Sequence, residues 1–264
     1  MATRKVMARN LPNTQAFLTL RLQTQAVFDF IVTVSYGVAA LRRQLQLLDK
    51  GVITALPLPD GFHPNNTPDQ LREMAKVYKQ QLAASSFLSL FSYFEAFVKN
   101  IIRETVSFHG GADALKALAE RHDREFIREE YDLEKLKRRV RRKREPGRVD
   151  QHEKYTRELL KLGYRFPSEL FSTYGVRMLI QKVENLRAAD IPDILTHGLH
   201  MPIDQSALEA YNEARETRNR IAHGTHVPLS IRDVAQKNDV LRRLSVELDR
   251  HINLYFMISE ESLK

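Results

Sequence analysis

The stretch FLSLFSYFEAFVKNII, residues 87 to 102, decides the fold, because its apolar side chains recur every three or four residues. That spacing places them along one side of an α-helix, whereas a half-buried strand would alternate apolar and polar residues. We interpret the aromatic side chains of this stretch as helix core or as a dimer surface, and not as platforms for stacked bases. They are Phe87, Phe91, Phe94 and Phe97.

Helical periodicity extends from this stretch through most of the chain, and strand-like alternation is scarce. Capping residues, glycines and prolines set approximate ends for each predicted helix. The helices expected are Asn13 or Thr14 to about Asp49, Thr67 or Asp69 to about His109, Ala112 to about Arg121, Phe166 to about Ala188, Ile203 to His223, and Ser230 almost to the end, with Asp190 to Pro202 as a loop. The sequence therefore predicts an all-α helical bundle.

The net charge of +8 is concentrated in one segment, Lys135 to Arg148 (KLKRRVRRKREPGR). Its excess of basic residues equals the formal net charge of the whole chain, so the remainder is neutral. Concentrated lysine and arginine attract polyanions through counterion release, and the guanidinium fork suits phosphate. A solvated charged helix or loop, an acidic protein partner and a membrane surface remain alternatives to nucleic-acid contact. The residues predicted to contact nucleic acid, which would be RNA if the family resemblance described below holds, are Lys135, Lys137, Arg138, Arg139, Arg141, Arg142, Lys143, Arg144 and Arg148.

The chain is expected to form a single domain over residues 1–264, with residues 124–164 as a charged helical insertion lobe. The absence of cysteine excludes disulfides, thiolate metal sites and cysteine nucleophiles, and it fits a reducing compartment. The longest apolar run, Phe30 to Leu41, is too short to span a bilayer, and the N-terminus lacks the order of a signal peptide. We therefore expect a cytoplasmic protein without a membrane segment.

The stretch TRNRIAHG places Arg218, Asn219 and His223 at what reads as a helix end. At about 100° per residue, Asn219 and His223 lie within roughly 40° of each other, whereas Arg218 diverges from His223 by about 140°. Either Gly224 ends the helix and lets the histidine turn away, or residues from two chains complete the site. The alternative is that His223 has no catalytic role and is a helix-end histidine that interacts with the terminal carbonyls.

A second unusual charge, Glu95, lies in an apolar helical seam, and Arg218 is predicted to lie on the apolar side of its own helix. Such charges need partners, so the two residues are expected to form one pair. Glu95 would then hold Arg218 in place and organise the site. A buried ion pair without any chemistry is the alternative.

Two histidine pairs with the same spacing suggest a competing metal site: His197 with His200, and His223 with His226. Four imidazoles could bind zinc or another transition metal. No carboxylate-rich cluster accompanies them, so we predict no metal and no cofactor. His197 and His200 are expected on a surface loop, and His226 together with Arg220 is expected to have an auxiliary role in the site.

The Arg218-Asn219-…-His223 motif and the glutamate-bearing helix of residues 87–102 resemble the HEPN superfamily of all-helical RNases, in particular its bacterial defence and toxin branches such as the RiboL-PSP type. The resemblance implies a metal-independent endoribonuclease that works as a homodimer on RNA, as a toxin or antiviral defence effector with an antitoxin or defence-system partner. Arg218, Asn219 and His223 would be its catalytic residues. Some HEPN proteins are catalytically inactive, so an RNA-binding or protein-interaction module is the alternative.

Overall fold

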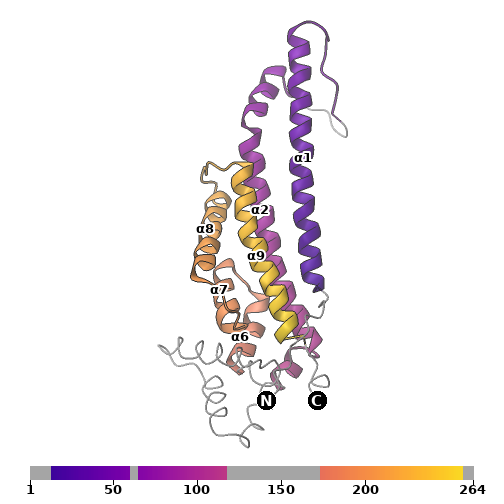
Figure 1. Ribbon diagram of the computed structural model, residues 1–264. Coiled ribbons are helices and arrows are strands. Elements are labelled where there is room, and N and C mark those ends of the chain that lie inside the picture. The colour runs from indigo at the N-terminus through magenta and orange to yellow at the C-terminus, as the bar shows by residue number, and fades with distance from the viewer. Residues whose placement is uncertain (1–12, 60–64, 118–172, 258–264) are drawn as a thin grey trace, which may run out of the picture. The chain divides into compact units, whose positions relative to one another are not determined.

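A computed structural model describes residues 13–59, 65–117 and 173–257 of this chain. Every regular element in these three ranges is helical, which confirms the predicted all-α fold (Figure 1). The elements are α1 (Gln15–Asp49), α2 (Pro68–Phe108), α6 (Thr173–Glu184), a 3₁₀ turn η1 (Ala188–Asp190), α7 (Ile191–Asp193), a π-helical turn η2 (Ile194–Gly198), α8 (Gln205–Ala222) and α9 (Ile231–Tyr255). Residues 112–117 are also helical.

The long helices begin at the capping residues that the sequence indicates. Thr14 caps α1, because its Oγ1 accepts a hydrogen bond from the Phe17 amide at 3.1 Å. Thr67 caps α2 through a capping box, in which its amide donates to Gln70 Oε1 at 2.9 Å and its hydroxyl accepts from the Gln70 amide at 3.3 Å. The starts of both helices are therefore encoded by residues next to them in the sequence.

The described residues divide into two compact units. Within the described residues, unit 1 comprises residues 13–20, 94–117, 173–215 and 240–257, and unit 2 comprises residues 21–59, 65–93 and 216–239. The helices α1, α2, α8 and α9 each contribute residues to both units. The single domain predicted from the sequence stays a prediction, and most of its insertion lobe, residues 124–164, lies outside the described residues.

Unit 1 buries its apolar residues around the last third of α2 and most of α9. Phe94 packs against Tyr211, with ring centroids 5.9 Å apart, and the Tyr211 hydroxyl donates to the Ala188 carbonyl at 2.8 Å. His251 is buried on α9, and its Nε2 lies 2.8 Å from the Leu199 carbonyl oxygen. Burial lowers the pKa of His251 to about 4, so the ring is neutral near pH 7 and donates to that carbonyl.

Two carboxylates hold the start of α1 within unit 1. Asp249 accepts hydrogen bonds from the Thr14 amide at 3.0 Å and from the Thr14 hydroxyl at 2.6 Å. Glu104 accepts from the amides of Gln15 and Ala16, each at 3.0 Å. Burial raises the pKa of Asp249, while the hydrogen bonds from Thr14 act in the opposite direction. These contacts satisfy amide groups that would otherwise lack partners at the helix start.

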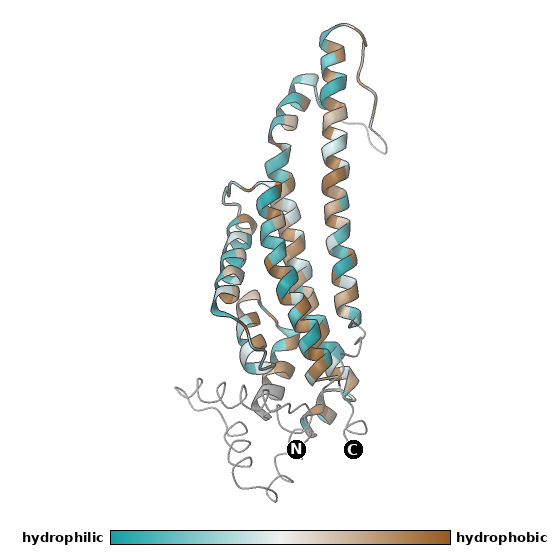
Figure 2. Ribbon diagram, viewed as in Figure 1, coloured by the Kyte–Doolittle hydropathy of each residue, from teal (hydrophilic) through white to brown (hydrophobic). Residues whose placement is uncertain are grey.

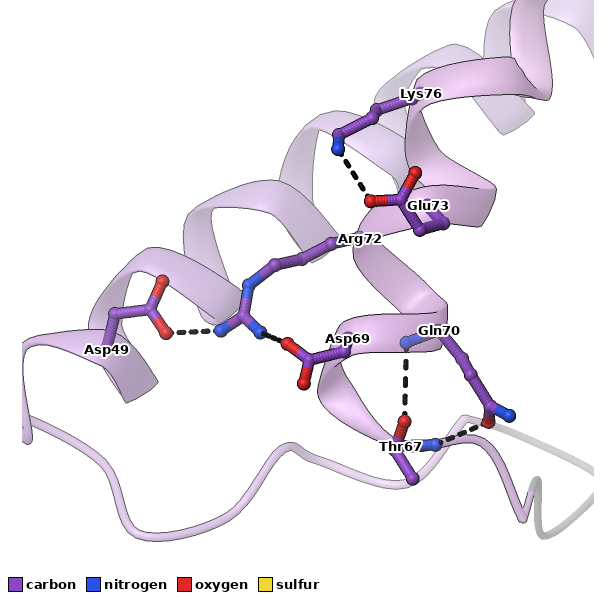
Figure 3. Close-up of polar contacts among 7 residues, drawn as sticks. All are labelled: Asp49, Thr67, Asp69, Gln70, Arg72, Glu73 and Lys76. Carbon is purple, nitrogen blue, oxygen red and sulfur yellow. Dashed lines mark hydrogen bonds and ion pairs between the residues drawn. The ribbon is translucent and has the colours of Figure 1, made fainter.

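In unit 2, polar contacts join the end of α1 to the beginning of α2 (Figure 3). Arg72 forms ion pairs with Asp49 on α1 and with Asp69 one turn earlier on α2. Arg42, also on α1, donates to the Ala75 carbonyl of α2. These bonds fix the pairing of the two helices at this end of the unit.

Helix α1 is exceptionally apolar for its exposure. It contains an 18-residue window that is long and apolar enough to cross a membrane, although only 11 % of that window is buried. The uncharged run of residues 30–41 is shorter than such a span, which is why the sequence predicted no membrane segment. Length and composition are the only grounds for a span, and apolar core helices meet the same criterion.

The segment of residues 190–202, predicted as a loop, contains the turns α7 and η2. His200 was expected at the surface and is 4 % exposed, with a positive φ of 53°. His197 lies within η2, where its Nε2 is 3.9 Å from Asp193 Oδ1. The prediction was wrong because five apolar residues near these histidines, Ile191, Ile194, Leu195, Leu199 and Met201, bury the segment.

Candidate functional site

The predicted motif lies at the end of α8, within unit 2. Arg218 and Asn219 are half-buried on the last turns of the helix, and His223 is exposed directly after its final residue. Gly224 follows with a φ of +75°, a conformation that glycine adopts without the penalty of a Cβ. Its amide donates to the Ile221 carbonyl at 2.9 Å, which completes the helix end. The prediction that Gly224 ends the helix is confirmed.

Arg218 is held by two contacts in unit 2. Its guanidinium carbon lies 5.8 Å from the centroid of the Phe91 ring on α2, a cation–π geometry. Its Nη1 donates to Asn219 Oδ1 at 3.2 Å, so the guanidinium reaches around the helix toward the neighbouring amide. This bond brings the guanidinium of Arg218 and the amide of Asn219 together, although the two side chains leave the helix in different directions. Because Asn219 Oδ1 is an acceptor here, the Nδ2 group is the hydrogen-bond donor of that amide.

His226 lies against α2 at a second place. Gln80 Nε2 is 3.1 Å from His226 Nδ1 and 2.9 Å from His226 Nε2, so the amide lies beside both ring nitrogens. Gln80 and Phe91 lie on the same side of α2, about 16 Å apart along the helix axis. The chain from Arg218 to His226 thus contacts one face of α2 at two points. The exposed His223 lies between these points in the sequence.

The remaining predicted site residues are placed differently. Arg220 is exposed on α8. Glu95 is half-buried on the part of α2 that belongs to unit 1, so it is less buried than its apolar seam suggested. Its predicted pairing with Arg218 stays a prediction. The nine basic residues between positions 135 and 148 lie outside the described residues.

Among residues 13–59, 65–117 and 173–257, no three histidine, aspartate or glutamate side chains gather as a metal site would require. The two histidine pairs also differ in surroundings: His200 is buried in unit 1, whereas His223 and His226 are exposed in unit 2. What the described part of the site offers is a positioned guanidinium, an amide donor and two exposed imidazoles. Such groups can bind a phosphate and transfer protons.

The model of a protein family described as RiboL-PSP-HEPN matches residues 62–254 of the chain. The chain belongs to this family. The match covers all of α2, α6, α8 and nearly all of α9, and therefore includes the Arg218–His223 motif, whereas α1 precedes it. No curated protein and no solved structure matches the chain. Membership indicates an RNA-related, nuclease-type function in general terms.

Two residues beside the motif were not predicted from the sequence as part of the site: Phe91 and Gln80. The interpretation of Phe91 as core is confirmed, since its side chain is fully buried, but the same ring also supports Arg218. Gln80 is an unremarkable amide in a polar stretch of α2. Nothing in the local sequence of either residue signals its contact with a segment more than a hundred positions away.

Proposed function

We propose that this protein is an endoribonuclease that cleaves RNA without a metal ion, with Arg218, Asn219 and His223 as its catalytic residues. The observation behind the proposal is that Arg218 lies over the Phe91 ring and donates to Asn219, five residues before the exposed His223 at the helix end. Family membership supports the same general class of function.

In the proposed reaction, the RNA 2′-hydroxyl oxygen attacks the adjacent phosphorus, and the bond from phosphorus to the 5′ oxygen breaks. A base removes the proton of the 2′-hydroxyl and an acid gives a proton to the leaving oxygen, so the products are a 2′,3′-cyclic phosphate and a 5′-hydroxyl. His223 serves in proton transfer, because the ordinary pKa of imidazole lies near neutrality. Arg218 stabilises the charge that develops on the phosphorane.

Asn219 and Phe91 have supporting roles in this scheme. The Asn219 amide accepts from Arg218 and presents its Nδ2 group to a phosphate oxygen. Phe91 limits the freedom of the Arg218 side chain, so less conformational entropy is lost when the guanidinium engages phosphate. Arg220 and His226 assist as auxiliary groups. Glu95 is proposed to organise the site by neutralising Arg218.

The reaction needs one acid and one base, and we propose that a homodimer supplies them as two copies of His223. A two-fold interface places a surface against its own copy, so both imidazoles and both guanidiniums would line one cleft. Mixing an inactive His223→Ala chain with wild type should then reduce activity more than dilution does. A fully active monomer in sedimentation at the assay concentration would rule out the composite site.

The basic residues 135–148 are proposed to bind the RNA backbone, because they account for the net charge of the whole chain. Replacing them with serine or glutamine should weaken binding and flatten the plot of log K against log salt by about 0.7 per lost contact to single-stranded RNA. An unchanged slope would show that this segment does not contact RNA.

A chelator assay tests the proposed chemistry. Purified protein in excess chelator should cleave RNA and leave 2′,3′-cyclic phosphate ends, whereas cleavage that stops in chelator and returns with one added metal would refute metal independence. His223→Ala should abolish cleavage with little change in thermal stability, because the side chain is exposed. Arg232→Ala, which removes an exposed charge from α9, is the matched control and should cleave normally.

The alternative function, a non-catalytic RNA-binding or protein-interaction module, would be supported if the protein binds RNA but leaves it intact, and if His223→Ala binds equally well. The proposed biological role is that of a cytoplasmic toxin or defence effector with a cognate partner protein. This role rests on the family resemblance alone.

A further inference from the structure

Helix α1 carries a seam of mostly exposed side chains, of which Ala40 also lines a cavity with the loop of residues 54–59. Eight of its residues recur at alternating intervals of four and three, the spacing of the contact positions in a coiled coil. Seven of them are exposed and the last is half-buried; Tyr36, at 76 %, and Leu22, at 74 %, are among the most exposed large side chains. The seam consists of Leu22, Ala26, Asp29, Thr33, Tyr36, Ala40, Arg43 and Leu47.

The other side of α1 is already packed. Val27, Ile31 and Leu45 are buried, and Arg42 donates to the Ala75 carbonyl of α2 while its guanidinium lies 5.6 Å from the centroid of the Tyr78 ring. Figure 2 shows hydrophobic residues along the middle of α1 as well as along α2. The helix is therefore apolar on the side that it buries and also along much of the side that it exposes. An apolar surface of this kind marks a site of association.

We propose that this seam binds the same seam of a second copy of the chain, with the two α1 helices antiparallel about a two-fold axis. The order of residues along the seam supports a second copy as the occupant. When the seam is aligned with a copy that runs in the opposite direction, the facing residues are complementary. With the axis between Thr33 and Tyr36, Leu22 faces the partner's Leu47 at each end of the seam.

The two charges of the seam fit the antiparallel register. Asp29 faces the partner's Ala40 and Arg43 faces the partner's Ala26, so each charged side chain has a small residue opposite it. Asp29 then lies about 4.5 Å along the axis from the partner's Arg43, within reach of an ion pair, and symmetry provides two such pairs. A parallel pairing would instead place Asp29 beside Asp29 and Arg43 beside Arg43.

The polar groups of the seam are compatible with burial. The Thr33 hydroxyl donates to the Asp29 carbonyl at 2.9 Å, so its hydrogen bond is satisfied within the helix. Gly37 lies beside the seam, and a Cβ built on it would meet nothing within 4 Å. A glycine inside a helix costs about 1 kcal/mol relative to alanine. Close approach of a second helix gives this glycine a role that unit 2 alone does not.

A lipid surface fits the seam less well than a second copy does. Asp29, whose carboxylate accepts a hydrogen bond from Gln25 Nε2 at 2.7 Å, and Arg43 would both have to enter the acyl chains, which is costly for a charged group. The bonds from Arg42 and Arg72 also tie α1 to the polar beginning of α2, which a membrane span would have to break. Because the family match starts at residue 62, this interface belongs to a helix outside the matched region.

The proposed α1 interface is independent of the nuclease site. The motif residues lie at the end of α8 and contact α2, and none of the eight seam residues belongs to the motif. If the motif dimer also forms, two different two-fold interfaces produce a closed tetramer or an open chain of dimers. The α1 proposal therefore stands or falls separately from the composite active site.

Charge reversal tests the proposal. Asp29→Arg and Arg43→Asp each place like charges together twice, and each should raise the dissociation constant measured by sedimentation equilibrium about ten-fold or more. The double variant Asp29→Arg/Arg43→Asp has the wild-type net charge and should restore association. Lys79→Glu changes an exposed charge on α2 and is the control, expected to associate as wild type does. Far-UV circular dichroism checks that every variant stays helical.

Each other outcome overturns the proposal. If the wild type is monomeric at all concentrations, or if the single reversals change nothing, α1 does not pair. If the single reversals weaken association but the double variant does not recover, the antiparallel register is wrong. A second experiment measures co-sedimentation of the protein with vesicles of phosphatidylcholine and phosphatidylserine. A protein that remains monomeric and binds these vesicles would identify a lipid surface as the occupant.

Discussion

The contact between Arg218 and Phe91 gives the most specific test of the site. Phe91→Leu removes the aromatic face but keeps an apolar side chain, and Phe87→Leu is its matched control. Both phenyl rings are fully buried on α2 in unit 2, and they pack edge to face with centroids 6.2 Å apart. Each substitution should lower the free energy of unfolding by about 1 to 2 kcal/mol through lost packing. The two variants differ in that only Phe91 lies under the guanidinium.

The expected magnitude follows from the geometry. A guanidinium 5.8 Å from a ring centroid, on a half-buried arginine, contributes about 0.5 to 1 kcal/mol beyond packing. A double-mutant cycle of Phe91→Leu with Arg218→Ala, measured by urea unfolding, should therefore give a coupling energy of about that size. The cycle of Phe87→Leu with Arg218→Ala should give a coupling close to zero.

The same pair of variants reports on catalysis. If Phe91 positions Arg218 for the transition state, Phe91→Leu should lower kcat/KM about two- to five-fold more than Phe87→Leu does. Equal couplings in the two cycles would refute the stacking contact, whatever the activity. Equal cleavage rates with unequal couplings would show that the contact exists but does not serve the reaction.

Two further predictions concern stability. The pKa of His251 is lowered to about 4 in the folded protein from an ordinary 6.5, so its stabilisation is complete above about pH 6.5 and is lost as the pH falls toward 4, a loss of about 3 kcal/mol. Urea unfolding across that range should show this loss in wild type, and the free energy of unfolding of His251→Gln should depend less steeply on pH. An equal pH dependence in both proteins would contradict the lowered pKa of His251. The effect of pH on Asp249 is the opposite. Because the pKa of this carboxyl is raised in the folded protein, its contribution to the free energy of unfolding declines as the pH rises. Gly224 has a φ of +75°, so Gly224→Ala should lower the free energy of unfolding by about 1 to 2 kcal/mol and should reduce cleavage by moving His223. Gly51 has a φ of +69°, so Gly51→Ala should lower stability in a thermal melt by as much but leave cleavage unchanged. Full activity of Gly224→Ala would show that the turn does not position the histidine.

The sequence by itself determined the helices, because their causes are local. The periodicity of residues 87–102 predicted a buried helix. Of the alternative caps predicted for the two long helices, Asn13 or Thr14 and Thr67 or Asp69, the structure uses Thr14 and Thr67, and the motif helix ends before Gly224. A side chain that bonds an amide three residues away, or a glycine that ends a helix, acts within one or two turns. Such effects can be recognised without knowing what the helix packs against.

Tertiary structure alone decided which residues surround the motif. Nothing near Phe91 predicts that its ring supports Arg218, and nothing near Gln80 predicts its contact with His226. His200 was misplaced because its segment was predicted to be a surface loop, whereas the apolar residues of that segment pack into unit 1 and His200 is buried with them. Helical periodicity specifies which face of a helix is apolar, but it does not specify which other face will cover it. That choice is made by packing among segments far apart in the chain.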